Sequence, residues 1–311
     1  MPELPEVTTT VLGLQRVLPG LTISSVWTDL AKKKQKIKHY QNTLKSEDFL
    51  FYFREEVVGA KVIKTERRAK NILIHLNNKK IILIHLKMTG HLIFGKYNFN
   101  KKENLWFPDK KERKELHDPY NRFIHVVFSF KENTNSLVFC DARKFGKVTL
   151  INNDFNKEDK HPLNLLGPEP LEKVFDFNKF KKQLFLKKNG KIKTVLMDQS
   201  VISGIGNIYS DEMLWLSSIH PESKVENIPL KNLRELYLSM KEVLTKGIKF
   251  GGDSTSDYRN IDGKKGNFQN KHNVYQKRNE PCGKRNCKGV IIRKVIGGRS
   301  SHFCNTHQKL Y

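Results

Sequence analysis

The sequence predicts an α+β protein with an N-terminal antiparallel β-sandwich or barrel, a helical second domain and a small metal-binding appendage. Residues 57–150 hold short runs rich in β-branched and aromatic residues, broken by Gly, Asn and Lys, which is typical of antiparallel sheets. Beyond a linker, LGPEPL at 166–171, apolar residues recur at helical spacing to about residue 250. The appendage is predicted because cysteines gather near the C-terminus.

Three further segments are assigned from spacing and composition. Val7 and Leu14 belong to an apolar series at near-helical spacing, and Pro5 suits a first helical turn, so a helix is expected directly after the N-terminus. Residues 97–118 are highly charged without clear periodicity, which indicates a surface loop or insertion. Residues 251–270 are polar and glycine-rich, and we expect a mobile loop there.

Charge and composition narrow the class of protein. The chain has 57 Lys and Arg against 32 Asp and Glu, a net charge of +25 spread along its length. This excess predicts a polyanionic partner, although a merely basic surface is the alternative and charge alone does not choose among DNA, RNA and membranes. There is no apolar stretch of 18 residues and no signal peptide pattern, so we expect a cytoplasmic protein with no membrane partner and reduced cysteines.

Four residues near the C-terminus have the spacing of a metal site: Cys282-x4-Cys287-x16-Cys304-x2-His307. Three thiolates and one imidazole, arranged in two close pairs, match the tetrahedral ligand set of a structural Zn²⁺. His302 is the competing fourth ligand. Because four protein ligands leave no open position for a reactive water, the sequence predicts one structural zinc ion.

The N-terminus carries a second candidate site. Removal of Met1 would expose Pro2 as a secondary amine with an ordinary pKa of about 8, which leaves a usable neutral fraction near pH 7. Glu3 and Glu6 stand close enough to move protons. By itself this pattern is also that of a simple helix start with acidic residues in its first turn.

Segments along nearly the whole chain resemble, in the same order, the formamidopyrimidine-DNA glycosylase and endonuclease VIII family: MPELPEV, ERRAKNILIHL, HLKMTGHL, DARKFG, LGPEPL, MDQSVISGIGNIYSDE and GGRSSHFCNTHQ. Leu4 is similar to the formamidopyrimidine branch, because the endonuclease VIII branch has glycine there. The resemblance implies a bifunctional DNA glycosylase and AP lyase of bacterial base excision repair, in the cytoplasm or nucleoid. The expected partner is damaged double-stranded DNA, and the protein is expected to be a monomer.

The resemblance also implies catalytic roles. Pro2 is expected to be the Schiff-base nucleophile, Glu3 the proton donor during glycosidic cleavage, and Glu6 its supporting partner. Lys70, in ERRAK, is expected to assist β-elimination, and Arg299, in GGRSSHFC, to bind phosphate and assist δ-elimination. Without the family match, Lys70 would be interpreted as an ordinary solvated lysine.

Chemistry on a stacked base requires that the base leave the helix, and side chains that fill the vacated space assist this step. By resemblance, Met88, Arg143 and Phe145 are the three insertion residues. Met88 and Phe145 follow apolar strands, where packing in a core is the alternative.

A phosphate-binding set is implied in the second domain. Asn207, in the GIGNIY turn, resembles the family residue that holds a phosphate, where glycines allow close approach of the backbone. Lys188 and Lys193 are expected to join it.

Several positions depart from the family pattern. His307 replaces the usual fourth cysteine ligand, and DARKFG stands for the more usual DPRRFG while keeping the arginine and phenylalanine. Phe123 falls where many relatives carry a DNA-contacting histidine, and Asn267 stands in a lesion-capping loop that often holds an aromatic residue. The preferred lesion is therefore the part of the function that these departures affect most.

The expected organisation has three parts: a catalytic β-sandwich domain with its N-terminal helix at 1–165, a helix-two-turn-helix DNA-binding domain at 166–270 with a lesion-recognition loop at 251–270, and a zinc β-hairpin at 271–311. The expected reaction removes oxidised purines, 8-oxoguanine and formamidopyrimidines opposite cytosine, and cleaves the strand by β,δ-elimination. The alternatives are an oxidised-pyrimidine glycosylase of the endonuclease VIII type and a non-catalytic DNA-binding homologue.

Overall fold

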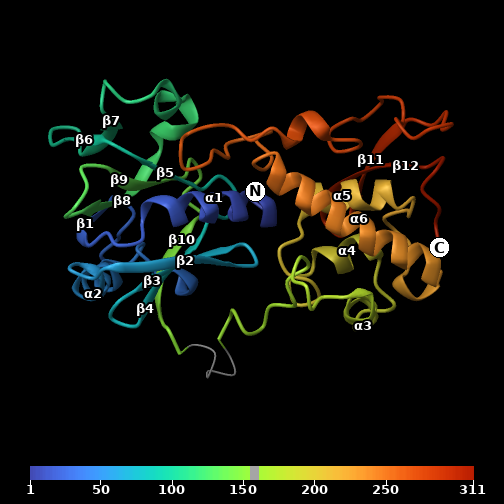
Figure 1. Ribbon diagram of the computed structural model, residues 1–311, viewed down its shortest axis with the longest axis horizontal. Helices are drawn as coiled ribbons and strands as arrows, with labels where there is room; N and C mark the ends of the chain where they lie inside the picture. Colours follow the sequence, from blue (N-terminus) through green and yellow to red (C-terminus); the bar gives the residue numbers. More distant parts are fainter. Residues whose placement is uncertain (155–160) are drawn as a thin grey trace. The chain divides into compact units, whose positions relative to one another are not determined.

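The computed structural model describes residues 1–154 and 161–311, and they divide into two compact units (Figure 1). The first unit comprises Met1–His161 and Gly251–Asn267, and the second comprises Pro162–Phe250 and Phe268–Tyr311. The segment 251–267 thus belongs by its contacts to the N-terminal unit. Among the described residues, no helix is long and apolar enough to cross a membrane.

The core of the first unit is a pair of four-stranded antiparallel sheets, which confirms the predicted α+β class and its sheet type. The sheet orders are β1-β8-β9-β5 and β10-β4-β3-β2. Their inner faces share one core, in which Ile72, Phe128 and Phe139 are at most 1% exposed. The strands are β1 (Ile23–Thr28), β2 (Val62–Arg68), β3 (Asn71–Leu76), β4 (Lys80–His85), β5 (His91–Gly95), β8 (Ile124–Phe130), β9 (Ser136–Cys140) and β10 (Lys147–Asn152).

Two helices pack on these sheets. The helix α1 (Leu4–Val17) is the predicted N-terminal helix, and its apolar face is buried in the same core as the strands. The helix α2 (Glu47–Val57) was not expected, because its periodicity is obscured by aromatic and charged residues. A single turn of 3-10 helix, η1 (Lys38–Tyr40), precedes α2.

The segment predicted as a surface loop or insertion forms a small hairpin of its own. The strands β6 (Tyr97–Asn100) and β7 (Leu105–Pro108) pair, and two short 3-10 helices, η2 (Lys114–His117) and η3 (Pro119–Arg122), follow. The rings of Phe99 and Trp106, which pair across this hairpin, pack against each other and against Trp27, with centroids 5.2–6.3 Å apart. The ring packing explains how such a charged segment becomes ordered.

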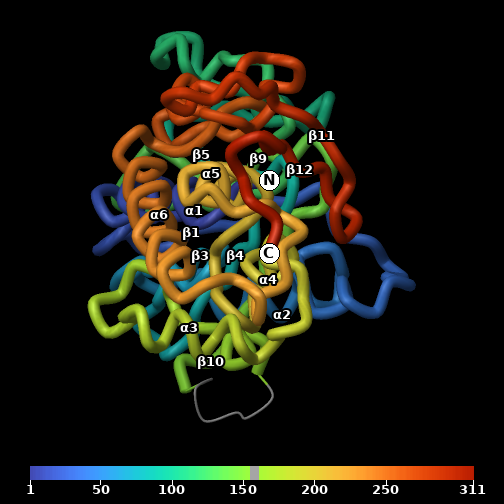
Figure 2. Tube along the Cα trace, turned by 90° about the vertical axis from the view of Figure 1, so that its right-hand side faces the viewer, coloured from blue at the N-terminus to red at the C-terminus, as the bar shows by residue number. Residues whose placement is uncertain are grey.

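The second unit is helical, as predicted, around a core that includes Phe180, Leu236 and Met240. Its elements are α3 (Phe177–Phe185), α4 (Ile192–Met197), α5 (Asn207–Leu216), η5 (Val225–Asn227), α6 (Leu230–Lys249) and η6 (Phe268–Lys271). The long helix α6 lies beside α5 and α3 (Figure 2). Residues 198–206 connect α4 to α5, and Gly204 within them has a φ of +88° that favours glycine.

A C-terminal hairpin completes the second unit. The strands β11 (Ile291–Ile296) and β12 (Arg299–Cys304) pair with Ile296 opposite Arg299, so only Gly297 and Gly298 form the turn. Their φ values of +56° and +75° fit a type I′ turn, which requires left-handed backbone at both positions. The two glycines thus place Arg299 at the start of β12.

Candidate active site and metal centre

The N-terminal end of α1 is a buried arrangement of two carboxylates. Glu3 is the N-cap residue and accepts a hydrogen bond from the backbone of the first turn, while the Glu6 carboxylate accepts the Glu3 N–H at 2.7 Å. Glu3 is 2% exposed, Glu6 is 1% exposed, and Pro2 is also buried. This capping box satisfies donors that a helix start leaves open. It also fixes the position of Glu3, whose carboxylate belongs to the residue directly after Pro2.

Lys70 lies at the same end of the unit as Pro2 and Glu3. The turn between β2 and β3 consists of Ala69 and Lys70, and Lys70 is 6% exposed. Gln15 Nε2 donates to the Thr65 carbonyl at 3.0 Å, which ties the far part of α1 to β2. The helix is about 18 Å long between Gln15 and Glu3. The strand β2 extends about 10 Å from Thr65 to the β2–β3 turn. The helix traced backward from Gln15 and the strand traced forward from Thr65 lead to the same end of the unit, where the start of α1 and the β2–β3 turn lie (Figure 1).

Positive charge is concentrated around this turn. Burial, with the Lys87 and Lys70 ammonium groups nearby, lowers the pKa of His85 to about 3. His85 is therefore neutral, and its Nδ1 accepts the Lys87 N–H at 3.0 Å. Burial also lowers the pKa of Lys87. The charges of Lys70, Lys87 and Lys147 around His85 are the part of this environment that attracts an anion.

The segment 251–267, predicted as a mobile loop, contacts Glu6. Asp253 N–H donates to Glu6 Oε1 at 2.7 Å, and the Tyr258 hydroxyl donates to the Glu6 carbonyl at 2.9 Å. Gly252 has a φ of +84°, and a Cβ there would lie 2.9 Å from Glu6 Cγ, so side chains are excluded at this position. The Glu6 carboxylate thus joins the helix start to this segment.

The segment is also fixed to the β6–β7 insertion. Arg259 is 1% exposed and donates from Nε and Nη2 to the Asp118 carboxylate, with distances of 3.1–3.3 Å. Arg113 Nε donates to the Asp262 carbonyl at 3.0 Å. The sequence analysis missed these residues, because pairs so distant in sequence leave no local pattern. They explain why a glycine-rich segment is ordered.

The three predicted insertion residues lie on two neighbouring turns of the first unit. Met88 is half-buried in the turn after β4, whereas Arg143 and Phe145 are exposed in the turn between β9 and β10. The Arg143 guanidinium lies 4.7 Å from the centroid of the Phe145 ring. Because Phe145 is 43% exposed, the alternative that it belongs to the core does not describe this structure.

A buried aspartate holds these two turns together. Asp141, 1% exposed, accepts hydrogen bonds from the Thr89 hydroxyl and, at 2.6 Å, from the Gly146 N–H. Thr89 Oγ1 in turn accepts the Arg143 N–H at 3.1 Å. Asp141 and Thr89 were not singled out from the sequence, although both stand inside the HLKMTG and DARKFG segments. Their hydrogen bonds fix the backbone that presents Arg143.

In the second unit, Asn207 is the first residue of α5 and its amide donates to the Ser300 carbonyl at 2.9 Å. Among the described residues nothing donates to Asn207 Oδ1, although that atom is buried. Arg299, next to Ser300, is exposed at the turn of the hairpin, and Lys188 is exposed before α4. Asn207 is therefore hydrogen-bonded to Ser300, the residue that directly follows Arg299.

Lys193 occupies a different place from Lys188. It is fully buried, and its ammonium donates to Asp211 Oδ1 at 2.6 Å, to Ser210 Oγ at 2.8 Å and to the Asn207 carbonyl at 2.9 Å. This position lies beneath the surface, so a direct phosphate contact by Lys193 does not fit the structure. Its charge is instead balanced by Asp211, which the sequence analysis did not identify.

Asp211 also fixes His302, the competing zinc ligand of the sequence analysis. Asp211 accepts the His302 N–H at 3.0 Å and the Ser301 hydroxyl at 2.6 Å. The His302 imidazole faces the same carboxylate at 3.4 Å. His302 thus belongs to the packing of β12 on α5, and His307 joins the cysteines.

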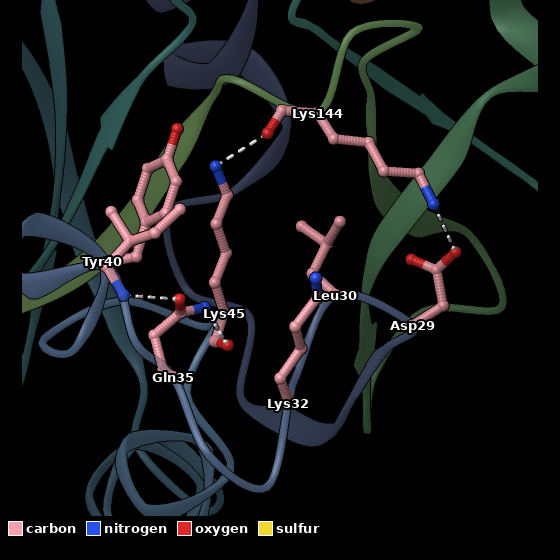
Figure 3. A pocket seen from close by; sticks show the side chains of 8 residues that line it. Asp29, Leu30, Lys32, Gln35, Tyr40, Lys45 and Lys144 are labelled. Atoms are coloured by element: carbon pink, nitrogen blue, oxygen red, sulfur yellow. Dashed lines mark hydrogen bonds and ion pairs between the residues drawn. The ribbon is translucent and has the colours of Figure 1, made fainter.

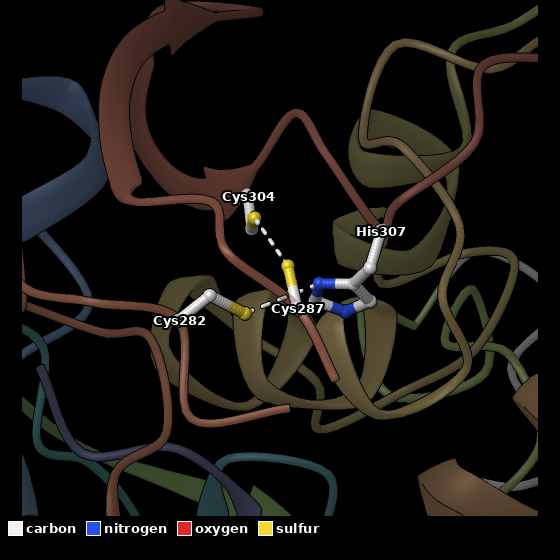
Figure 4. A group of neighbouring side chains, drawn as sticks. All are labelled: Cys282, Cys287, Cys304 and His307. Carbon is white, nitrogen blue, oxygen red and sulfur yellow. Dashed lines mark hydrogen bonds between the residues drawn. The ribbon is translucent and has the colours of Figure 1, made fainter. Parts of the chain in front are cut away.

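The predicted metal ligands converge. One ligand atom from each of Cys282, Cys287, Cys304 and His307 lies within 4.8 Å of the others (Figure 4). Cys282 Sγ lies 3.2 Å from His307 Nδ1, and Cys287 Sγ lies 3.7 Å from Cys304 Sγ. Three sulfurs and one nitrogen at these separations fit a tetrahedral ion.

Groups around the cluster orient its ligands. His307 Nε2 lies 3.0 Å from the Trp215 carbonyl, an arrangement that leaves Nδ1 as the ligand atom. The Trp215 indole donates to Cys282 Sγ at 3.3 Å, and the Gly289 N–H donates to Cys287 Sγ at 3.3 Å. A Cβ at Gly289 would lie 2.7 Å from Cys304 Sγ, so the cluster also requires this glycine. Trp215 and Gly289 were not predicted from the sequence.

Two of the departures from the family pattern, Phe123 and Asn267, lie in the first unit. Phe123 is half-buried, with the Arg122 guanidinium 4.8 Å from its ring centroid, and His125 Nδ1 pairs with Asp29 at 2.9 Å. Asn267 is exposed at the end of the segment 251–267. Neither residue is tied to the Glu3 and Glu6 carboxylates by a contact in the described chain.

Comparisons with known proteins agree with this architecture. Residues 1–148 match the family model of the formamidopyrimidine-DNA glycosylase N-terminal domain, and residues 166–259 match the model of the formamidopyrimidine-DNA glycosylase H2TH domain. Formamidopyrimidine-DNA glycosylases of Mycoplasma mobile and Pelotomaculum thermopropionicum are 35% and 34% identical, with 100% of each chain covered. The relative of the same name from Bacillus subtilis is 33% identical, with 98% of each chain covered.

Solved structures give the same result. The Lactococcus lactis Fpg in complex with DNA containing an abasic site aligns with a TM-score of 0.78 and 29% identity, covering 97% of both chains. A mutant of the Lactococcus lactis protein in complex with DNA containing Fapy-dG aligns with a TM-score of 0.79 and 29% identity, covering 97% of this chain and 98% of that one. The chain belongs to the formamidopyrimidine-DNA glycosylase family of DNA-repair enzymes.

Proposed function

We propose that this enzyme excises oxidised purines, 8-oxoguanine and formamidopyrimidines opposite cytosine, and then cleaves the DNA strand by β,δ-elimination. The observation that carries the proposal is the start of α1, where Pro2 and Glu3 are buried and the Glu6 carboxylate holds the Glu3 backbone. A buried carboxylate next to a potential N-terminal amine is an arrangement for proton transfer at a reacting carbon.

The proposed first step is attack by the Pro2 nitrogen, once Met1 is removed, on C1′ of the damaged nucleotide. The new N–C1′ bond forms as the glycosidic bond breaks, and the departing base takes a proton from Glu3. Opening of the sugar ring then leaves a cationic iminium between Pro2 and C1′. Glu3 is 2% exposed, so its carboxyl group lies where bulk water does not compete for the transferred proton.

The second step is strand cleavage. The iminium withdraws electrons from the sugar, so a proton is lost from C2′ and the 3′ phosphate departs, and a second elimination releases the 5′ phosphate. Lys70, buried at the same end of the unit, is proposed to assist the first elimination. Arg299, exposed on the hairpin and adjacent to the residue that holds Asn207, is proposed to bind phosphate and assist the second.

The insertion residues are proposed to enter the duplex when the damaged base leaves it. The solved relatives in complex with abasic-site and Fapy-dG DNA support binding of damaged duplexes by this fold. The exposed Phe145 with the Arg143 guanidinium against its ring, and the neighbouring Met88, offer apolar and cationic surface for the vacated space. Asn207 and Lys188 are proposed to contact phosphates, with Lys193 holding Asp211 and the start of α5 in place.

The cysteine and histidine cluster is proposed to hold one structural Zn²⁺. The ligand set fits this ion, and bound zinc would fix the hairpin that carries Arg299. No chemical step passes through the metal, because all four of its positions are filled by protein.

A panel of lesions tests the substrate class. We expect excision of 8-oxoguanine and formamidopyrimidine from duplexes opposite cytosine, with both ends of the resulting gap bearing phosphate, as seen on a sequencing gel. Dihydrouracil and thymine glycol duplexes serve as the comparison. Faster excision of the pyrimidines would instead support an endonuclease VIII-like specificity, and binding without reaction on any lesion would support a non-catalytic homologue.

A further inference from the structure

We propose that a cavity beside the turn of Arg143 and Phe145 binds a backbone phosphate of duplex DNA, an inference that rests on the DNA-repair function proposed above. The cavity of about 250 Å³ opens between the segment 29–46 and the turn between β9 and β10 (Figure 3). It is lined by Asp29, Leu30, Lys32, Gln35, Ile37, Tyr40, Lys45 and Lys144. None of these residues has a part in the proposed reaction.

Lys45 is the residue that indicates an anion. It is 6% exposed, and burial together with the neighbouring Lys147 and Lys87 charges lowers its pKa to about 8, against the opposing effect of Asp141. Its ammonium donates to the Lys144 carbonyl at 2.6 Å and lies 3.6 Å from the Tyr40 ring centroid. An ammonium has three N–H donors, and a buried one without a carboxylate partner is costly.

The only acidic side chain that lines the cavity is already engaged. Asp29 pairs with His125 Nδ1 at 2.9 Å and with the Lys144 ammonium at 3.6 Å. In the described part of the chain, Lys45 and Lys147 have no ion pair. Figure 3 shows the Lys45 side chain extending past Leu30 with its ammonium directed at the Lys144 carbonyl, away from Asp29. The cavity therefore keeps an excess of positive charge.

A second cation converges on the same ring. The Lys147 ammonium lies 5.6 Å from the Tyr40 centroid, and Lys87 also lowers the pKa of Lys147, after burial. Neighbouring cations that repel one another are stabilised together by one bound monoanion, because each gains a counter-charge. A phosphate oxygen has the charge and size for this place.

Position and sequence favour DNA as the source of the phosphate. Lys144 is flanked by Arg143 and Phe145, so a duplex in contact with these two residues passes the cavity mouth. The segment beside it, KKKQKIK at 32–38, holds five lysines and no acidic residue. Further along the same stretch of chain, the Leu44 N–H donates to the Val148 carbonyl of β10 at 3.0 Å.

The test compares Lys45→Gln with the parent chain by titrating a fluorescent duplex at several salt concentrations. We expect roughly tenfold weaker binding and a salt slope reduced by about one, because one phosphate contact is lost. Lys80→Gln is the matched control, since Lys80 is partly buried beside Tyr52 but is already paired with Glu56. Lys45→Arg should restore the slope, which separates loss of charge from loss of folding.

Equal affinity and slope for Lys45→Gln and Lys80→Gln would overturn the proposal. A thermal shift caused by inorganic phosphate that is lost in Lys45→Gln, with no change in the DNA slope, would also overturn it, because the site would then hold a free anion. The proposed function is judged separately by lesion excision in the parent chain. Its failure would leave the salt-slope comparison intact.

Discussion

Glu3→Gln is expected to slow base excision by about 10²- to 10⁴-fold while cleavage of a preformed abasic site persists. Glutamine can still accept the backbone hydrogen bond at the start of α1 but does not supply a proton to a departing base. An abasic site has no base to protonate, so its cleavage needs only the amine and the later eliminations. The measurement is the single-turnover rate on 8-oxoguanine and abasic duplexes.

The matched control for this variant is Glu132→Gln. Glu132 also accepts a backbone N–H, from Thr22 at 2.7 Å, but lies on the surface with no part in the proposed site. Both rates should stay at the parent value in that variant. If excision and abasic-site cleavage fall by the same factor in Glu3→Gln, the residue supports the fold of α1 and is not the proton donor.

Loss of the metal is expected to have the second large effect, on structure and on DNA binding together. Structural zinc contributes an apparent ~10–16 kcal/mol in zinc-finger peptides, which is comparable to the whole stability of a domain. In Cys287→Ser the β11–β12 hairpin should lose its fixed position. Arg299 and the Ser300 carbonyl, which accepts a hydrogen bond from Asn207, lie on this hairpin and should be displaced with it. We expect loss of zinc, a lower Tm and DNA binding weakened by at least about tenfold.

Metal analysis, a melting curve and titration of a fluorescent duplex measure the three effects in turn. Cys140→Ala is the control, because Cys140 is buried in β9, donates to the Asn121 carbonyl and lies outside the cluster. It should keep one zinc per chain. A Cys287→Ser chain that retains stoichiometric zinc and parent affinity for DNA would contradict the assignment of the ligands.

The architecture was largely predictable because periodic patterns report which faces are buried. The β-rich runs, the N-terminal helix and the two cysteine pairs each carry a local signal, and the structure confirms the α+β class and brings the four predicted ligands together. The helix α2 was missed, since its many aromatic and charged residues obscure the apolar stripe.

The supporting residues could not be predicted, because their partners are distant in the chain. Nothing near Asp118 indicates Arg259, and nothing near Asp253 indicates Glu6, yet these pairs order the segment 251–267. Lys193 shows the converse, since a lysine beside a DNA-binding pattern is expected at the surface but is buried here. The sequence shows that a lysine is present, but it does not show whether its side chain points to the solvent or into the core.

The most direct test of the central claim is to identify the atom that bonds to DNA. The protein is incubated with an 8-oxoguanine duplex and borohydride, and the trapped adduct is digested and sequenced by mass spectrometry. The account predicts that the sugar remnant is attached to the N-terminal nitrogen of Pro2, on a chain that has lost Met1, and that chains retaining Met1 give no adduct. A remnant attached to Lys70 or to another lysine would contradict it.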